Sequence, residues 1–429
     1  MSPNDSRLDA LQRYAEGTAS RDDVAAIERA IAGDAEFRTL LVEYLHLDAA
    51  LEEFGFVREA AVPHIRSPRR WYSALAAAVA VAVMGFSWWL WRPGQTPASP
   101  VEVEVLQLVD VEVAGSNRGL RAHDLLQLGS LEIRGGEARL RLPSAVELTV
   151  SGPAELRFID AMHARVTRGK VTVDCSAAGQ GFVIDTPVTR VVDISTQFGV
   201  EARADGSTDV MVIKGSVELL NPQKTRHAAP LTQGEAVRVD TTRALARIVN
   251  ITGGPRPGQW STQPPPPDCN IISVSDNFGA SEGYHFYRIV PHGLEPGAVV
   301  YTNRAYVWKP LPGQPFPASL THADVVQTFF GELTHPAYAI EIQVARPVDL
   351  FVLMPRRGTP QPWLTESFTR TGDQILLDEG GVPSRPRPPL YFEVWKRTIL
   401  QAGKVTLGPG NRDDKGGPTG MYGIAAKAL

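Results

Sequence analysis

The feature that most constrains this chain is an unbroken stretch of uncharged residues, WYSALAAAVAVAVMGFSWWLW, at positions 71–91. At about 1.5 Å per residue, a helix of this length spans roughly 31 Å, which matches the ~30 Å hydrocarbon thickness of a bilayer. Aromatic residues gather at both ends, as they do at membrane interfaces: Trp71, Tyr72, Trp88, Trp89 and Trp91. Because a long polar segment precedes the stretch, we expect a retained transmembrane helix rather than a cleaved signal peptide.

The charges beside this segment predict its orientation. A basic juxtamembrane segment, residues 58–70, contains Arg58, Arg66, Arg69 and Arg70, whereas only Arg92 follows the segment closely. Because Lys and Arg next to a span resist translocation, we expect a cytoplasmic N-terminus and an extracytoplasmic C-terminus. Small residues within the span leave open a homodimer formed through it: Ala74, Ala78, Ala82 and Gly85.

Residues 1–57 are predicted to form a small all-α module, because apolar residues recur in them at helical spacing. The last of its three helices has an apolar face that is broader than two short partner helices readily cover. The module contains five basic and twelve acidic residues, so this face suits a basic helical partner. Leu41 and Tyr44 are the candidate contacts on that face. The alternative is a self-contained bundle with a solvated acidic surface.

Beyond a Pro-rich linker at 92–100, the pattern changes to period two. Segments such as EARLRLP and ARVTRGKVTVDC alternate apolar and polar residues, which is typical of strands. Tight turns are predicted at Gly135–Gly136, Arg168–Gly169, Asp205–Gly206 and Lys214–Gly215. We expect residues 101–245 to form an elongated, β-solenoid-like domain in which successive turns stack around a narrow core.

A Pro/Gly-rich linker at 246–267 is predicted to lead into a separate domain at 268–429. Short apolar runs separated by Pro and Gly loops favour a β-sandwich there, and the closing strands resemble those of galactose-binding-like jelly rolls. Trp363, in the loop-like GTPQPWLTE, is the candidate for stacking a ligand such as a glycan. A Trp363 packed under a strand is the alternative. Trp308 is a further candidate, and core packing is the favoured interpretation of Trp395.

Five motifs in the central region occur in the order found in the FecR family of bacterial transmembrane signal transducers. They are GPAELRFID, VTRGKVTV, GFVIDTPVTRVVDISTQFGVE, VMVIKGSVELL and LTQGEAVRV, between residues 152 and 239. Residues of about 115–240 thus resemble a FecR domain, and the N-terminal helices resemble the anti-sigma-like segment of such proteins. The resemblance implies an inner-membrane regulator that controls an extracytoplasmic-function sigma factor in response to an outer signal.

The resemblance ends before the C-terminal domain. Ferric-citrate-type FecR proteins continue into a small secretin-and-TonB-like subdomain, whereas this chain continues through the proline-rich GGPRPGQWSTQPPPPDC. A TonB-dependent transporter and an iron signal are therefore not implied. The alternative function, from a different class, is a membrane-anchored envelope protein that binds a glycan or another protein and regulates no sigma factor.

The sequence contains no pattern typical of an enzyme, a metal site or a cofactor site. It has no nucleophile elbow, P-loop or zinc-protease motif, and its net charge of -4 gives no reason to expect direct nucleic-acid binding. Two cysteines are too few for a disulfide framework. Four histidines lie in the last domain, at 285, 292, 322 and 335. Asp373, Asp378 and Glu379 form an acidic cluster that could serve hydrolysis or hold calcium, although a solvated turn is the favoured interpretation.

The arginine asymmetry makes a testable prediction about topology. A reporter that is active only outside the cytoplasm should be active when it is fused after Val101 and silent when it is fused after Val57. A cytoplasm-specific reporter at the same two positions is the matched control and should give the opposite result. The reverse pattern in both reporters would contradict the predicted orientation.

Overall fold

The computed structural model describes the part of the chain that follows residue 99. The chain divides into two compact units, Met1–Arg92 and Pro93–Leu429, and all described residues belong to the second unit. They are residues 100–114, 120–175, 177–194, 196–220, 230–254, 258–278, 283–330, 337–379, 390–413 and 419–429.

These residues correct the predicted fold class. The described chain is mainly β, as expected, but it contains no all-α module, and its one α-helix is the short α5 (Pro362–Ser367). Nowhere in the described ranges is there a helix with the length and apolarity that a membrane span requires. The predicted helical module at 1–57, the predicted span at 71–91 and the contact candidates Leu41 and Tyr44 lie outside the described residues.

The first β region comprises the strands between residues 101 and 247, and it begins with five antiparallel strands. In order of pairing they are β2 (Leu125–Leu128), β1 (Val101–Val113), β3 (Ser130–Arg141), β4 (Glu147–Asp160) and β5 (His163–Asp174). Alternation decides which face is buried: in β4, Leu148 and Val150 are fully buried, whereas Thr149 and Ser151 beside them remain partly exposed. This period-two pattern gives the sheet one apolar and one polar face.

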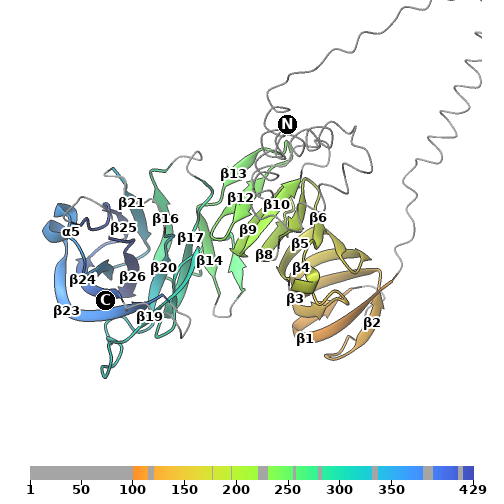
Figure 1. Ribbon diagram of the computed structural model, residues 1–429, viewed down its shortest axis with the longest axis horizontal. Helices are drawn as coiled ribbons and strands as arrows, with labels where there is room; N and C mark the ends of the chain where they lie inside the picture. The colour runs from red at the N-terminus through yellow and green to blue at the C-terminus, as the bar shows by residue number, and fades with distance from the viewer. Residues whose placement is uncertain are drawn as a thin grey trace, which may run out of the picture. The chain divides into compact units, whose positions relative to one another are not determined.

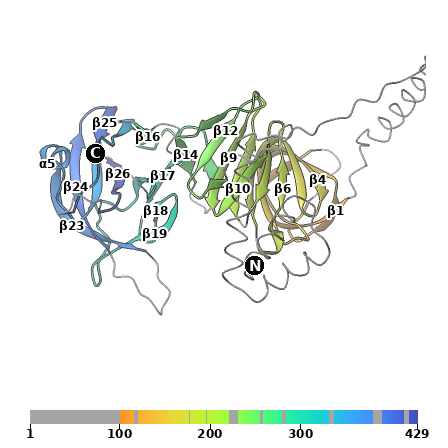
Figure 2. The same ribbon diagram turned by 45° about the horizontal axis from the view of Figure 1, so that its top comes forward.

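The sheet divides at β5 (Figures 1 and 2). The first residues of β5 pair in parallel with β6, and its last residues pair antiparallel with β8. One branch contains β6 (Val183–Asp185), β7 (Arg190–Asp193), β10 (Ser216–Leu220) and β11 (Leu231–Thr232). The other contains β8 (Gln197–Ala202), β9 (Thr208–Lys214), β12 (Ala236–Val239) and β13 (Leu245–Arg247).

Both branches bury side chains in one core. Val191 and Val217 from the first branch share it with Val200 and Val210 from the second. The predicted β-solenoid is therefore wrong, because hairpin-linked strands pair antiparallel with their neighbours instead of stacking as successive coils. The physical reason is that short glycine turns reverse the chain and leave too few residues for the parallel coils of a solenoid.

A row of β-bulges crosses four neighbouring strands. The register shifts between Val109 and Glu112 in β1, between Ile133 and Glu137 in β3, and between Ser151 and Glu155 in β4, where β4 also shifts against β5. Bulges of this kind bend a strand and increase its local twist.

Glycines permit the close approach of backbones in this row. A Cβ on Gly136 would lie 2.2 Å from the carbonyl oxygen of Asp110, and one on Gly169 would lie 2.5 Å from Cα of Ala154. The predicted turns at Gly135–Gly136 and Arg168–Gly169 are therefore bends inside strands. Gly206 and Gly215, in contrast, lie between consecutive strands as predicted.

The second β region is built from two sheets around a shared core. The larger has the order β15-β14-β17-β20-β26-β22-β24-β23-β19-β18, and the smaller has the order β16-β21-β25. Ile342 of the small sheet and Val352 of the large sheet are both fully buried in the same cluster. This arrangement is a β-sandwich, in which each sheet covers the apolar face of the other.

The large sheet contains β14 (Asn250–Gly253), β15 (Trp260–Ser261), β17 (Tyr287–Leu294), β18 (Val299–Tyr301), β19 (Arg304–Lys309), β20 (Ala323–Gln327), β22 (Val348–Pro355), β23 (Thr369–Asp378), β24 (Leu390–Ile399) and β26 (Gly423–Ala428). The small sheet contains β16 (Ile271–Asp276), β21 (Ile340–Val344) and β25 (Gly403–Leu407).

The predicted linker at 246–267 contributes two strands, β14 and β15, to the second β region. β14 pairs in parallel with β17 and antiparallel with β15. A third apolar cluster joins this segment to the first β region, and its buried members are Met211, Ala236, Ile248, Ile251, Trp260 and Phe286. The two β regions are thus connected by packed side chains as well as by the backbone.

Candidate ligand-binding cleft

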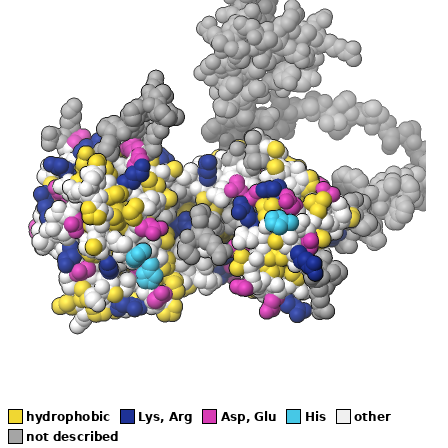
Figure 3. Space-filling view, turned by 90° about the horizontal axis from the view of Figure 1, so that it is seen from below, with side chains coloured by type: hydrophobic (Ala, Val, Ile, Leu, Met, Phe, Trp, Pro, Cys, Tyr) yellow, Lys and Arg dark blue, Asp and Glu magenta, His cyan; other side chains and the backbone are white. Residues whose placement is uncertain are grey.

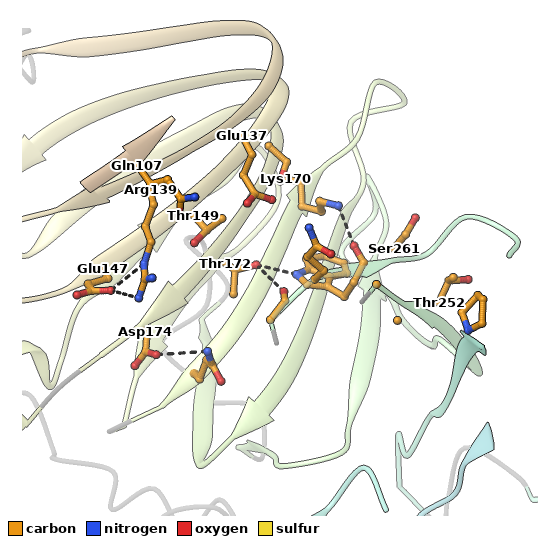
Figure 4. A pocket seen from close by; sticks show the side chains of 18 of the residues that line it. Gln107, Glu137, Arg139, Glu147, Thr149, Lys170, Thr172, Asp174, Thr252 and Ser261 are labelled. Carbon is orange, nitrogen blue, oxygen red and sulfur yellow. Dashed lines mark hydrogen bonds and ion pairs between the residues drawn. The ribbon is translucent and has the colours of Figure 1, made fainter. Parts of the chain in front are cut away.

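A cleft of about 1050 Å³ lies over the polar face of the first β region. One wall is formed by side chains of β1, β3, β4, β5 and β8 on one side of the bulge row, and the other wall is formed by β14, β15 and the residues beside them (Figure 4). The volume is at the upper end of the range for small-molecule sites. Because both walls contribute, the cleft depends on the docking of residues 250–261 against the sheet.

Trp260 fixes that docking. Its indole lies directly on Gly199 of β8, where a Cβ would come within 2.3 to 2.5 Å of three ring atoms. The indole Nε1 donates a hydrogen bond to the hydroxyl of Thr172 at 3.0 Å, and the side chain is only 3% exposed. Glycine is thus the residue at position 199 that leaves room for the ring, because any larger residue would displace it.

Lys170 holds the same tryptophan from a second direction. Its Nζ donates to the carbonyl oxygen of Trp260 at 2.7 Å and lies 5.5 Å from the centroid of the indole. Burial lowers the pKa of Lys170, and the nearby carboxylates of Glu201 and Glu137 oppose that shift. The ammonium group is therefore fixed between the two walls rather than free in the cleft.

Two further arginines bind the segment that forms the second wall. Arg203, the residue after β8, donates to the carboxylate of Asp209 and to the hydroxyl of Thr262, each at 3.2 Å. Arg288 of β17 donates to the carbonyl oxygen of Gln259 at 2.8 Å, and burial lowers the pKa of its guanidinium. The segment at 258–262 is thus held by an arginine from each β region.

A buried ion pair lies at the base of the connection between the regions. Arg247 of β13 binds Asp276 of β16 through two parallel hydrogen bonds of 2.8 Å, and its Nε donates to the carbonyl oxygen of His285 at 2.6 Å. Tyr287 also donates to Asp276, at 2.7 Å. Since the side chain of Asp276 is only 1% exposed, this network satisfies a carboxylate that would otherwise be buried at high cost.

His285 is the titratable group beside this network. Its ring stacks on Phe329 with a centroid separation of 4.8 Å, and its buried Nδ1 has no hydrogen-bond partner among the described residues. Burial lowers the pKa of His285, although the carboxylate of Glu235 opposes the shift. The imidazole is thus held in its neutral form more strongly than it would be in an unfolded chain.

The sequence-predicted aromatic candidates lie away from the cleft, in the sandwich. Trp363 is partly buried, donates to the carbonyl oxygen of Pro409 at 2.9 Å, and packs against Phe368 and Tyr422. These contacts match the packed alternative, and ligand stacking at Trp363 stays a prediction. Trp308 and Trp395 belong to the core of the sandwich.

The described polar candidates are not brought together into a site, and His335 lies outside the described residues. Asp373 accepts a hydrogen bond from Ser319, and Asp378 pairs with Lys309. Among the described residues, no group of three His, Cys, Asp or Glu side chains is placed to hold a metal ion. Cys175 and Cys269 are free and buried, and burial raises the pKa of the Cys269 thiol to about 12.

Positive and negative side chains are mixed on the face of the molecule that Figure 3 shows. On the face in Figure 3, Lys and Arg side chains are interspersed with Asp and Glu side chains instead of forming a broad patch of one sign. A nucleic-acid interface needs a continuous basic surface, so this face has no such character.

Sequence reasoning missed the residues that build the cleft, namely Lys170, Thr172, Gly199 and Trp260. Thr172 and Gly199 lie in predicted strands, where nothing distinguishes them from their neighbours. The signal that was available is Trp260, a large aromatic residue within a segment otherwise rich in Pro, Gly, Gln and Thr. Such a residue is seldom left in solvent.

A domain family model matches most of the sheet that forms one wall of the cleft. Residues 131–218 match the family model described as FecR protein. The chain therefore contains a FecR domain, which confirms the resemblance expected from its motifs. No curated protein matches the chain significantly.

Solved structures give weaker similarities. Two crystal structures of a candidate anti-sigma factor from Parabacteroides distasonis ATCC 8503 are 19% and 18% identical to the chain and both have a TM-score of 0.25. They cover 28% and 27% of this chain, which in turn spans 58% and 57% of theirs. A beta-glucuronidase from glycoside hydrolase family 2 is 11% identical, with 78% of this chain and 36% of that chain covered and a TM-score of 0.30. Scores this low support no inference about function.

The contact between the indole of Trp260 and Gly199 can be tested with a double-mutant cycle. Gly199→Ala should destabilise the chain by about 1–3 kcal/mol, because the new methyl group displaces the indole. In a Trp260→Ala background the same change should cost much less, since the ring is gone. Urea unfolding followed by circular dichroism measures both effects.

Gly135→Ala is the matched control for this cycle, because a Cβ at that strand glycine meets nothing within 4 Å. It should show no coupling to Trp260→Ala. Additive costs for Gly199→Ala and Trp260→Ala would contradict the proposed contact.

The position of His285 predicts a dependence of stability on pH. Its folded-state pKa lies below the ordinary value of about 6.5, so the unfolded chain takes up the proton first as the pH falls. Its contribution is thus fully present above about pH 6.5 and is lost as the pH falls from there towards the folded-state pKa. The advantage of the native chain over His285→Gln in melting temperature should therefore shrink between pH 7.5 and pH 5.

A difference between the native chain and His285→Gln that stays constant from pH 7.5 to pH 5 would show that burial of His285 does not control the pH response.

Proposed function

We propose that this chain is a regulator of an extracytoplasmic-function sigma factor that responds to a signal received by its β regions. The observation that supports this most is the FecR match at residues 131–218, which includes β3, β4, β5 and β8 of one wall of the cleft. In this proposal, residues 1–57 contact the sigma factor, and the FecR domain with the C-terminal sandwich receives the signal.

The proposal places the chain at the bacterial inner membrane, with its N-terminus in the cytoplasm and residues 100–429 outside. The arginine asymmetry of the sequence and the location of FecR-type regulators support this arrangement. The reporter fusions after Val57 and Val101 test it. No catalytic activity, metal or cofactor is part of the proposal.

A second candidate function is an envelope-binding protein without sigma-factor control. The cleft favours it, because a polar site of this size suits a glycan or protein ligand regardless of what the N-terminus does. The two functions differ in their prediction for residues 1–57. Capture of a sigma factor by these residues supports regulation, and ligand binding without such capture supports the second function.

The proposed regulation predicts the effect of two substitutions in the N-terminal module. An extracytoplasmic-function sigma factor of the source bacterium should co-purify with the full chain, and Leu41→Ala combined with Tyr44→Ala should abolish the association. The expected loss is about 2–4 kcal/mol or more if both side chains are central anchors, because such residues carry most of the energy of an interface. Pull-down and a sigma-dependent transcriptional reporter measure the effect.

The polar Arg13→Ala variant of the same module is the control and should retain the sigma factor. Unchanged binding in the double variant, with an unchanged circular dichroism spectrum, would exclude this face as the contact. Absence of any captured sigma factor by the unsubstituted chain would contradict the regulatory function itself.

A further inference from the structure

The cleft contains neutral polar side chains that have no partner within the described part of the protein. Gln107 of β1 and Thr149 and Ser151 of β4 line it, and their side chains make no hydrogen bond to any described residue. Figure 4 shows Gln107 and Thr149 on the strands of one wall. These groups offer a carboxamide and two hydroxyls, which donate and accept hydrogen bonds.

Charged groups of the cleft, in contrast, already have hydrogen-bond partners. Arg139 donates to Glu147 through Nε at 3.0 Å, and Asp174 accepts from Gln197 at 3.3 Å. Lys170 is bound to the carbonyl oxygen of Trp260. An ionic ligand would have to break these pairs, whereas a neutral ligand leaves them intact.

The central strands of the cleft, β4, β5 and β14, offer no free backbone edge to a peptide, and the edge strand β15 is only two residues long. β4 is paired with β3 on one side and with β5 on the other, and β5 is paired with β4 and β8. β14 likewise has β15 and β17 as partners. Addition of a peptide strand needs an exposed edge, so a ligand here must be recognised by side chains.

We propose that the cleft binds an uncharged, polyhydroxylated chain, that is, a neutral oligosaccharide. Its hydroxyls would pair with Gln107, Thr149 and Ser151 along neighbouring strands, and the cleft of about 1050 Å³ has room for several sugar rings. Recognition depends on hydrogen bonds rather than on stacking, because the face of Trp260 is buried against Gly199. This deepens the proposed function, on which it rests for the role of the ligand as the signal.

Calorimetric titration of the purified full-length chain tests the ligand class. The neutral probes are maltohexaose, cellohexaose and hexa-N-acetylchitohexaose, and the comparison ligands are the anionic hexagalacturonate and an uncharged hexapeptide. We expect at least one neutral hexasaccharide to bind, and to bind at least tenfold more tightly than either comparison ligand. Failure of all three neutral probes, or tighter binding of hexagalacturonate or of the peptide, would overturn the inference.

Substitutions locate the binding. Thr149→Val combined with Ser151→Ala removes two hydroxyls with little change of shape and should weaken binding about tenfold, and Gln107→Ala should weaken it further. Thr406→Val, on the exposed face of β25, is the matched control and should leave affinity unchanged. Equal affinity in the native chain and the cleft variants, all with unchanged circular dichroism, would overturn the assignment of the cleft.

The inference and the proposed function fail separately. Sigma-factor capture depends on Leu41 and Tyr44 and is measured without any saccharide. Retained capture without saccharide binding would overturn only the ligand class. Saccharide binding without capture would support the inference and leave the second candidate function in place of regulation.

Discussion

The contact of Trp260 with Gly199 is the interaction on which the relation between the two β regions depends. An indole that lies directly on a strand backbone needs a residue without a side chain beneath it, and position 199 provides one. Thr172 satisfies the indole N–H, and Lys170 satisfies the carbonyl group of the same residue. One residue of a proline-rich segment thereby becomes buried, and the segment becomes a wall of the cleft.

The row of β-bulges bends the sheet beside this contact. Gly136 and Gly169 let neighbouring backbones approach closely, and the strands bend at that level. The polar residues that line the cleft from β1, β3, β4 and β5 all lie on one side of the bend. A flat sheet would present the same side chains without a concave surface, so the glycines that resemble turns in the sequence determine the shape of the site.

Much of the architecture followed from the sequence, because alternation and family motifs are local signals. The strands of the FecR domain and the β-sandwich were expected, since an alternation such as that of Leu148, Thr149 and Val150 can be recognised without knowing which strands pair. The branching at β5 was not predictable, because one strand pairs with β6 and β8 over different parts of its length. Likewise, the Pro/Gly content of 246–267 predicts a linker, and only tertiary contacts convert it into β14 and β15.

The candidate site was less predictable than the fold. Its residues come from five strands of one region and three of the other, and single threonines and glycines carry no recognisable pattern. Trp363 attracted attention because it lies in a loop-like segment, yet its indole is packed on Phe368 and Tyr422. Trp260, in the segment predicted to be a linker, indicates the position of the cleft better than Trp363 does.

Together these features describe a FecR domain whose polar face is covered at one end by the C-terminal region, with a cleft between the two walls. A signal that changes the contact at Trp260 would act on both regions at once, because Arg203, Arg247 and Trp260 all join them. The residues that receive the signal would then be the same residues that hold the two β regions together.

The measurement that tests this central claim most directly is hydrogen exchange of the full chain, native and Trp260→Ala, followed by mass spectrometry. Loss of the indole should accelerate exchange in β8 and in β14 together, while β22 and β24 in the core of the sandwich remain as protected as in the native chain. Faster exchange confined to residues 258–262, with β8 and β14 unchanged, would show that Trp260 does not couple the two regions.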